Sequence, residues 1–595
     1  MFRHLHQTEG KAEVNTKGKK EVSTEDAAKI STEGDESAPG TGKGQRESDP
    51  LSVKIQEWSR FIIDVVICVC LVLMIAVMPF YFEDGYVHIA TDKAVLCRRI
   101  NRAVFRILIP ALAVYFGSSL TVFLQERKGR LTKAVWLEQL RIIWKRVTLT
   151  DKFMALYGVV LIVSYLCSDY KETALWGAGN GWYIGFLPQL MLVGTYFFTA
   201  KLWRPRRSFF YLLFPASAAV FLLGYLNRFS FYPIAMETRS PDYFISTIGH
   251  INWYCGYAVT VFFAGMAFVW QKYGRTWQRI LLYGYLLLGF GTLVTQGSTS
   301  GIVTLGIMLL VLFVMSAGNG EKMCSFFAVT VLLSAACLFT ALLRSAMPER
   351  LNRNDEVINM LTTGILPIVM AVVSLVLFAL FYILNRKGAY PQKCMSLLAK
   401  ITVVSVSCLF ALSVLMMIVN TIYPGSLGGL SENPVFTFSN DWGSGRGGTW
   451  KAGAMCFWEQ DLLHKLVGVG PDAMAAYLYQ GGSDGLHQLL DTAFKGLTLT
   501  NAHNEWLTVL ADTGILGLVC FGGAMVTAIG TFLKKSGKSV SAEGGGRAVY
   551  CACGFSLLAY TLNNIFSFQQ TVSLTTMMLI LGVGMAFLRE EGTNS

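Results

Sequence analysis

One histidine lies directly before a long apolar segment late in the chain. It is His503, in the run TNAHNEW at residues 500–506. Asn501 is a suitable N-cap for a helix that continues into the apolar segment, which would place His503 in the first helical turn. The helix dipole disfavours the imidazolium there, and a general base must be a neutral imidazole near neutral pH. We therefore interpret His503 as a candidate general base; the alternative is an interfacial histidine that only forms hydrogen bonds near lipid headgroups.

Two arginines have the side chain that suits a phosphate ligand. Arg446 lies in GSGRGGTW at residues 443–450, and Arg239 lies in ETRS at residues 237–240. The small residues around Arg446 allow backbone and guanidinium to approach a ligand closely. A planar guanidinium forms paired hydrogen bonds with phosphate oxygens. Both arginines are candidate phosphate contacts, although arginines in exposed loops commonly have no ligand.

Other polar and aromatic residues around these positions have simpler explanations. Glu505 is a carboxylate in the first turn of the predicted helix, where it complements the helix dipole, and adjacent helical residues do not face each other. Asp512 is two turns further along, and helix packing explains it as well as a function would. Trp450 is either an aromatic-belt residue or a platform for a sugar. We retain Asn501, Asn504, Glu505 and Trp450 as supporting residues.

The cysteines do not form a metal-binding pattern. The chain has 13 cysteines, almost all in apolar runs, and the close pair Cys551 and Cys553 lacks the two-residue spacer of a zinc-binding pair. We expect no metal, no disulfide framework and no cofactor.

The elements that must position these residues are membrane spans. Of the 595 residues, 53% are hydrophobic and 15% are charged, whereas soluble domains carry roughly 25% charged residues. Apolar stretches of membrane length predict an all-α integral membrane protein with about 14 transmembrane helices. The expected spans are residues 61–82, 107–124, 153–168, 183–200, 209–225, 251–271, 280–296, 301–317, 324–342, 365–384, 401–420, 506–533, 548–566 and 570–588.

Charge distribution predicts the orientation of these spans. Residues 1–57 are polar and highly charged, which indicates a disordered cytoplasmic tail before a polytopic domain at residues 58–595. With that tail inside, the inward loops hold Lys and Arg at roughly three times the density of the outward loops. Both termini are then cytoplasmic, and the net charge of +12 needs no nucleic acid to explain it. One point stays open: residues 297–300 form either an outward turn or a break within one helix.

One outward loop is much longer than the others. Residues 421–505 contain no apolar run of membrane length, and the amphipathic stretch from Trp450 to Leu466 indicates order. Long connections in compact proteins are usually functional or disordered. We expect this large extracytoplasmic loop to carry the chemistry, since it holds Arg446 and ends at His503.

Several short motifs follow one another in an order found in one known family. They are Arg-x-x-x-Trp at residues 446–450, Gly-x-Gly at 468–470, Asn-x-His-Asn at 501–504 and Gly-x-x-Gly at 514–517. Upstream, TIGHINWY at residues 247–254 and ALWG at 174–177 are similar to two further segments of that family. Over residues 170–590 the chain resembles the O-antigen ligase and O-antigen polymerase superfamily (Wzy-type, WaaL-like).

The resemblance implies a GT-C-like membrane fold and a metal-independent enzyme. Members of the superfamily transfer a glycan from an undecaprenyl diphosphate carrier to an acceptor hydroxyl on the outer face of the membrane. Carried onto this chain, His503 corresponds to the base and Arg446 to a diphosphate contact. Arg239 is a weaker assignment, because its neighbours match no motif closely.

The chemistry of the residues fits that activity. A lipid diphosphate leaves as an anion, so the protein must supply positive charge and needs no general acid. One neutral imidazole can align and partly deprotonate the acceptor hydroxyl. The expected activity is that of an inverting glycosyltransferase in the plasma membrane that polymerises or ligates surface polysaccharide of the O-antigen or capsule type, with polymerisation favoured. Expected partners are the lipid-linked donor, a glycan, lipid or protein acceptor, the bilayer and other polysaccharide-export proteins.

A transporter or flippase of a lipid-linked or anionic substrate is the alternative. About fourteen spans suit such a protein. Transporters, however, usually place ionisable residues or broken helices at mid-membrane, and the predicted spans between residues 183 and 420 are nearly free of charge. A scaffolding protein would leave the long loop and its histidine unexplained.

Overall fold

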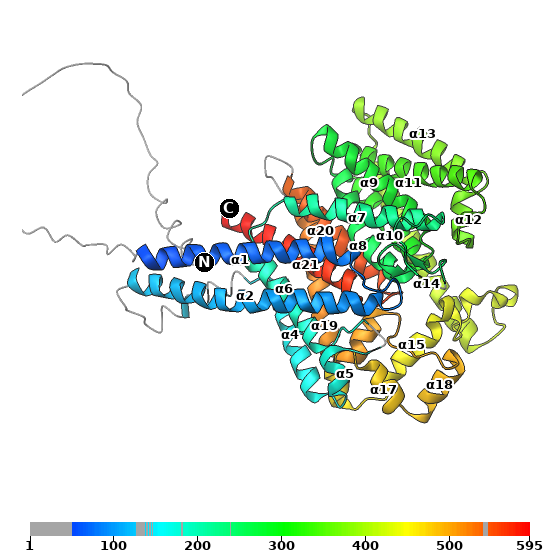
Figure 1. The fold of residues 1–595 in the computed structure, drawn as a ribbon. Coiled ribbons are helices and arrows are strands. Elements are labelled where there is room, and N and C mark those ends of the chain that lie inside the picture. Colours follow the sequence, from blue (N-terminus) through cyan, green and yellow to red (C-terminus); the bar gives the residue numbers. More distant parts are fainter. Residues whose placement is uncertain are drawn as a thin grey trace, which may run out of the picture. The chain divides into compact units, whose positions relative to one another are not determined.

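The fold is almost entirely helical, as the sequence predicts. The computed structural model describes residues 50–126, 137, 138, 141, 144, 147–179, 182–237, 240–538 and 545–594 (Figure 1). The helices before the long loop are α1 (Pro50–Val72), η2 (Leu73–Val77), η3 (Met78–Phe80), α2 (Ile89–Glu126), α4 (Leu149–Cys167), α5 (Lys171–Trp176), α6 (Phe186–Phe197), η4 (Phe198–Leu202), α7 (Ser208–Arg228), α8 (Ile251–Trp270), α9 (Thr276–Thr295), α10 (Thr299–Ser316), α11 (Gly320–Ala346), α12 (Glu356–Thr362), α13 (Leu366–Arg386) and α14 (Gln392–Ile422). The later ones are η5 (Gly428–Glu432), η6 (Pro434–Phe436), α15 (Trp442–Trp458), α16 (Leu462–Val467), α17 (Met474–Gln480), α18 (Asp484–Phe494), α19 (Glu505–Lys538), α20 (Gly545–Asn563) and α21 (Thr571–Asn594). Strands β1 (Phe244–Ile245) and β2 (Gly249–His250) pair antiparallel.

Fewer helices qualify as membrane spans than the sequence predicts. Each of the segments predicted to span coincides with a helix, but 11 helices of the described part are long and apolar enough to cross a membrane. The other three are α6, α9 and α20. Helix α6 has 12 residues before the π-helical turn η4. Helix α9 begins with polar residues that include Gln278 and Arg279, and α20 is rich in small residues.

The chain divides into two compact units. One unit comprises Met1–Val66 and Phe105–Arg146, and in its described part Gln56 Nε2 donates a hydrogen bond to Ser119 Oγ over 2.8 Å. The other comprises Ile67–Val104 and Val147–Ser595 and contains all the candidate site residues.

Helix α1 begins inside the segment that the sequence assigns to the N-terminal tail. Helix α1 begins at Pro50, so residues 50–57 are helical and do not belong to the tail. Proline is favoured in the first turn of a helix, because its missing N–H would have no partner there. Residues 1–49 lie outside the described residues.

The open question about residues 297–300 has a clear answer. Cys255 near the start of α8 contacts Ser300 near the start of α10 (Sγ to Oγ 3.7 Å), and Trp270 Nε1 at the end of α8 donates to Ser316 Oγ at the end of α10 over 2.8 Å. Helix α10 therefore runs parallel to α8. Because α9 directly follows α8 and returns across the same unit, the segment between α9 and α10 is a turn and not a break within one helix.

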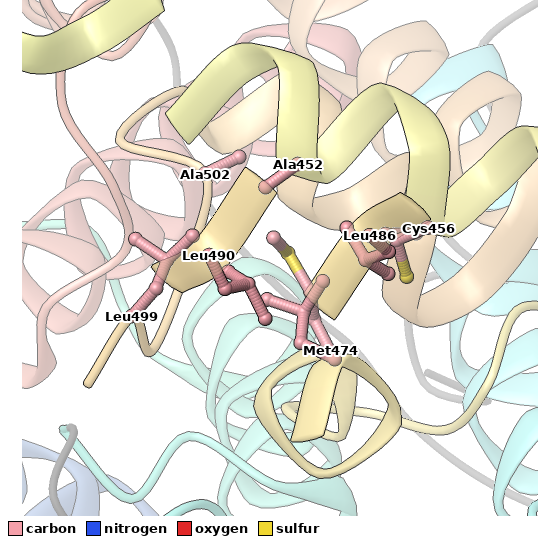
Figure 2. Close-up of a cluster of buried hydrophobic side chains, with 9 residues drawn as sticks. Ala452, Cys456, Met474, Leu486, Leu490, Leu499 and Ala502 are labelled. Atoms are coloured by element: carbon pink, nitrogen blue, oxygen red, sulfur yellow. The ribbon is translucent and has the colours of Figure 1, made fainter. Parts of the chain in front are cut away.

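The long loop is a small helical subdomain. Helices α15, α17 and α18 and the segment before α19 enclose a common apolar core (Figure 2). Its buried residues are Ala452, Cys456, Met474, Leu478, Leu486, Leu490, Leu499, Ala502 and Ala511. Burying such side chains contributes roughly 1.5–3 kcal/mol for each large one. Since Ala502 is part of this core, the subdomain fixes the backbone of the residue directly before His503.

Candidate functional site

His503 lies in a tight turn before α19 and not in its first helical turn. Its φ is +48°, in the left-handed region, and its N–H donates to Asn501 Oδ1 over 2.9 Å. Asn504 Oδ1 accepts from the N–H of Leu507 over 3.1 Å, so Asn504 is the residue that caps the helix. The predicted cap at Asn501 is therefore wrong. Asn501 forms an Asx-type turn that holds the backbone of His503 instead.

Glu505 does not face His503. Its side chain is fully buried and accepts hydrogen bonds from Tyr560 Oη (3.0 Å), Gln569 Nε2 (3.1 Å) and Asn564 Nδ2, while its own N–H donates to the carbonyl of Asn564 over 2.9 Å. A buried carboxylate with this many donors is well compensated. Glu505 therefore ties the start of α19 to residues 564–570, which connect α20 to α21.

Arg446 binds the same connection. Its Nε donates to the carbonyl of Phe566 over 3.0 Å and its Nη1 to the carbonyl of Gly443 over 2.8 Å. Gly443, Ser444 and Gly445 all have left-handed φ values, which break α15 just before Arg446. A Cβ on Gly447 would approach the carbonyl oxygen of Ser439 to 1.9 Å, so only glycine fits there.

His503 and Arg446 thus meet at one short segment of chain. The His503 ring lies edge-on to the ring of Phe568, with centroids 5.0 Å apart, two residues from the carbonyl that Arg446 binds. Burial, together with the positive charges of Arg446 and then His250, lowers the pKa of His503 to about 4. Burial also lowers the pKa of Arg446. The arrangement presents a neutral imidazole next to a guanidinium.

The glycines of the predicted motifs mark close backbone crossings. A Cβ on Gly468 would lie 2.2 Å from the carbonyl carbon of Asp512, and one on Gly514 would lie 2.3 Å from that of Leu466. Gly514 has φ +68° and ψ −171° and kinks α19. These contacts press the 466–470 segment against α19, just below the turn that carries His503.

The carboxylates of Asp512 and Asp472 lie close to the place where residues 466–470 contact α19. Asp512 Oδ1 accepts from the N–H of Met474 over 2.8 Å and so caps α17, which agrees with the packing explanation. Asp472 Oδ2 accepts from the N–H groups of Ala178 (2.9 Å) and Ile184 (3.1 Å), and burial raises the pKa of Asp472 to about 7. Both line a cavity together with Trp182, Asn501, Phe568 and Gln569.

The remaining predicted residues have varied positions. Arg239 lies outside the described residues. The ring of Trp450 stacks on Phe566, with centroids 5.9 Å apart, so it forms a wall beside Arg446. His464 Nε2 lies 3.3 Å from the carbonyl oxygen of Cys167 and Nδ1 lies 3.0 Å from Asp461 Oδ1, which makes it a structural residue of the loop. In the part of the chain that is described, no three His, Cys, Asp or Glu residues gather as metal ligands would.

A family comparison identifies the region that carries these residues. Residues 357–522 match the family model of the O-antigen ligase. The chain contains an O-antigen ligase domain. This confirms the superfamily that the motifs indicated. Arg446 and His503 lie inside the matched region, and Arg239 lies outside it. A search among curated proteins found no match.

The O-antigen ligase domain defines the general activity. The protein is a multi-pass membrane enzyme of the ligase or polymerase type that acts in polysaccharide assembly. The matched domain covers the long loop and its flanking spans, from α12 into α19. The connection at residues 564–570, which completes the site, lies beyond the matched region.

Sequence reasoning missed this connection. Residues 563–570 read NNIFSFQQ, and four side-chain amides between two apolar helices are an unusual composition. Buried amides need hydrogen-bond partners, so this run was a signal for a polar contact inside the protein.

Proposed function

We propose that this enzyme transfers a glycan from an undecaprenyl diphosphate carrier to an acceptor hydroxyl at the extracytoplasmic face of the plasma membrane. The observation that carries the proposal is the meeting of His503 and Arg446 at residues 566–568. A base and a positive charge are the two groups that this reaction needs.

His503 suits the role of the base. Because the pKa of His503 is about 4, its ring is neutral at physiological pH. The acceptor hydroxyl gives its proton to the imidazole while its oxygen forms the new bond to the anomeric carbon. Binding of an anionic diphosphate cancels part of the positive charge that disfavours the imidazolium, so the donor itself makes the base stronger.

Arg446 suits the role of the diphosphate contact. As the bond between the anomeric carbon and the diphosphate oxygen breaks, negative charge develops on the leaving group, and a half-buried guanidinium stabilises it more strongly than one in water. Attack from the face opposite the leaving group inverts the configuration. No step of this path requires a metal ion. Arg239 is proposed as a further diphosphate contact.

Within this activity we favour polymerisation of repeat units over ligation to a final acceptor. The long polar segment before residue 58 fits a protein that works beside other polysaccharide-export proteins. The proposed topology places both termini in the cytoplasm and residues 421–505 outside.

A reconstituted assay tests the activity. Purified wild-type protein, His503→Ala and the control His464→Ala are incubated with undecaprenyl diphosphate oligosaccharide, and product length is measured on a gel. We expect a ladder with wild type and His464→Ala, and a loss of about 100-fold or more with His503→Ala.

Two other outcomes of this assay would change the proposed function. A single size increase that requires an added acceptor would identify a ligase. Equal activity of wild type and His503→Ala would exclude His503 as the base.

A further inference from the structure

The start of α2 carries an arginine pair that the proposed reaction does not use. Arg98 and Arg102 are four residues apart, so they share a helix face. Arg98 Cζ lies 5.2 Å from the ring centroid of Trp176 and 5.7 Å from that of Tyr183, and Arg102 Cζ lies 4.6 Å from that of Trp176. One indole ring therefore holds two guanidinium groups.

This positive charge is not compensated. Among the described residues, neither arginine forms an ion pair with a carboxylate, and the charge of Arg102 acts against that of Arg98. Like charges one helical turn apart destabilise a helix. Positive charge on the outward side also opposes the usual distribution in membrane proteins. A bound anion would offset both the repulsion between the two arginines and the unfavourable positive charge on the outward side.

The pair lies before the apolar stretch of α2 at residues 107–124, so the predicted topology places it near the outer end of this span. Trp176 and Tyr183 belong to the connection between α4 and α6 on the predicted outward side. One turn along α2 from Arg98, Asn101 is buried and accepts a hydrogen bond from Thr195 Oγ1 of α6 over 3.0 Å. An anion that reaches this depth is best carried by a lipid, whose phosphate lies at the surface while its chain lies in the bilayer.

The pair also lies next to the candidate site. One cavity is lined by Arg98, Tyr183, Ile184 and Thr571, and Ile184 also lines the cavity that contains Asn501 and Phe568. Thr571 begins α21 directly after the 564–570 connection, and its Oγ1 donates to the carbonyl of Trp182 over 3.2 Å. Arg98 therefore lies near the start of α21, directly after the connection whose Phe566 carbonyl binds Arg446.

We propose that Arg98 and Arg102 bind the diphosphate of a second lipid-linked glycan, which serves as the acceptor. This rests on the proposed function, with the donor diphosphate at Arg446. Two guanidinium groups provide enough donors for several phosphate oxygens. Both substrates are then lipid-linked, and the product is a longer glycan on the acceptor lipid plus free undecaprenyl diphosphate. The site selects polymerisation.

Lipid stoichiometry tests the second site. Full-length protein in nanodiscs is titrated with undecaprenyl diphosphate, and bound lipids are counted by native mass spectrometry. We expect two for wild type, one for the double variant Arg98→Gln/Arg102→Gln, one for Arg446→Gln and two for His503→Ala. Each arginine removed should weaken binding at its site roughly tenfold.

A matched control and a fold check accompany these variants. Arg350→Gln removes another outward arginine, whose Cζ lies 4.6 Å from the ring centroid of Phe231, and should leave two lipids bound. The lipid that remains on the double variant shows that the protein is folded. Arg98→Lys/Arg102→Lys keeps the charge and should recover part of the affinity.

Three results would overturn the second site. They are one lipid on the wild type, two on the double variant, or displacement of the second lipid by phosphatidylglycerol or inorganic pyrophosphate as readily as by the polyprenyl diphosphate. Failure of the proposed function looks different: two lipids would bind as expected, yet the wild type would form no glycan product. Product formation with a single bound lipid would reject the second site alone.

Discussion

Burial, followed by the positive charge of Arg446, sets the protonation state of His503, the proposed base. Burial and the nearby guanidinium both disfavour the imidazolium, so the pKa of His503 is about 4. The ordinary value for histidine is about 6.5. His503 is therefore neutral over the whole physiological range, although an ordinary histidine titrates within that range.

Removing the guanidinium should change the pH profile as well as the rate. In Arg446→Gln, the pKa of His503 should rise towards its ordinary value, because one of the causes of its depression is gone. The acidic limb of the transfer rate should then move to higher pH, and the rate at pH 7.5 should fall about 100-fold. The measurement is a rate profile that extends on the acid side below the His503 pKa of about 4 and on the basic side to pH 8. An unchanged acidic limb would show that His503 is not the titrating base.

Asp472 should make stability depend on pH in the opposite direction to an ordinary carboxylate. Its pKa is raised to about 7 in the folded protein, so the folded state binds a proton that the unfolded state releases above about pH 4. The contribution of Asp472 to the free energy of unfolding is therefore most favourable below about pH 4, and it is lost as the pH rises through 7. Asp472→Asn should therefore raise the melting temperature by a few degrees at pH 8 and by less at pH 5, measured by tryptophan fluorescence in detergent. An equal effect at both pH values would contradict this assignment.

The sequence predicts which side chains are candidates for the site, but it does not predict which residues contact them. His503 and Arg446 were identified by residue type and small neighbours, and the structure brings them together. The direction of Glu505 could not be predicted, because its hydrogen-bond donors lie about sixty residues later in the chain. The sequence places Glu505 in the first turn of the helix, but the direction of its side chain depends on contacts with residues far away in the chain.

Helix α19 shows how a single element positions the site. Its kink at Gly514 lets the 466–470 segment press against it, and the part before the kink belongs to the loop subdomain through Ala511. The sequence predicted one span from residue 506 to 533. Hydropathy describes this segment well but does not show a kink, which depends on one residue with positive φ.

Gly514 should tolerate no side chain. Gly514→Ala combines a backbone conformation that is almost restricted to glycine with a Cβ 2.3 Å from the carbonyl carbon of Leu466. We expect a loss of about 2–4 kcal/mol in stability. Gly530 in the same helix is the matched control, since a Cβ there would meet nothing within 4 Å. Gly530→Ala should be neutral or stabilise by up to about 1 kcal/mol, and equal melting temperatures for both variants would contradict the kink.

The whole molecule follows the hydropathy pattern closely. Every predicted span is a helix, because apolar stretches of this length have no other backbone solution in lipid. The order of helices around the site was not predictable, since contacts such as those between α4 and α19 or α8 and α20 join distant parts of the sequence. The loop subdomain was predicted only as ordered, and its core required the structure.

Cysteine labelling tests the orientation of the molecule. Cys394 is exposed at the start of α14, on the predicted inner side, and Ser426 is exposed in the long loop. With the partly exposed Cys167 at the outer end of α4 replaced by serine, a membrane-impermeant maleimide should label Ser426→Cys in intact cells and leave the parent protein unlabelled. Permeabilised cells should show labelling of Cys394. Labelling of Ser426→Cys only after permeabilisation would reverse the topology and place the site in the cytoplasm.

The connection at residues 564–570 also has a consequence for biosynthesis. When His503 leaves the ribosome, the carbonyl that Arg446 binds and the donors that Glu505 needs have not yet been translated. The proposed site can therefore assemble only after the connection between α20 and α21 has been translated. A chain that stops before α20 would carry both residues of the proposed reaction, yet it would lack the connection that binds Arg446 and Glu505.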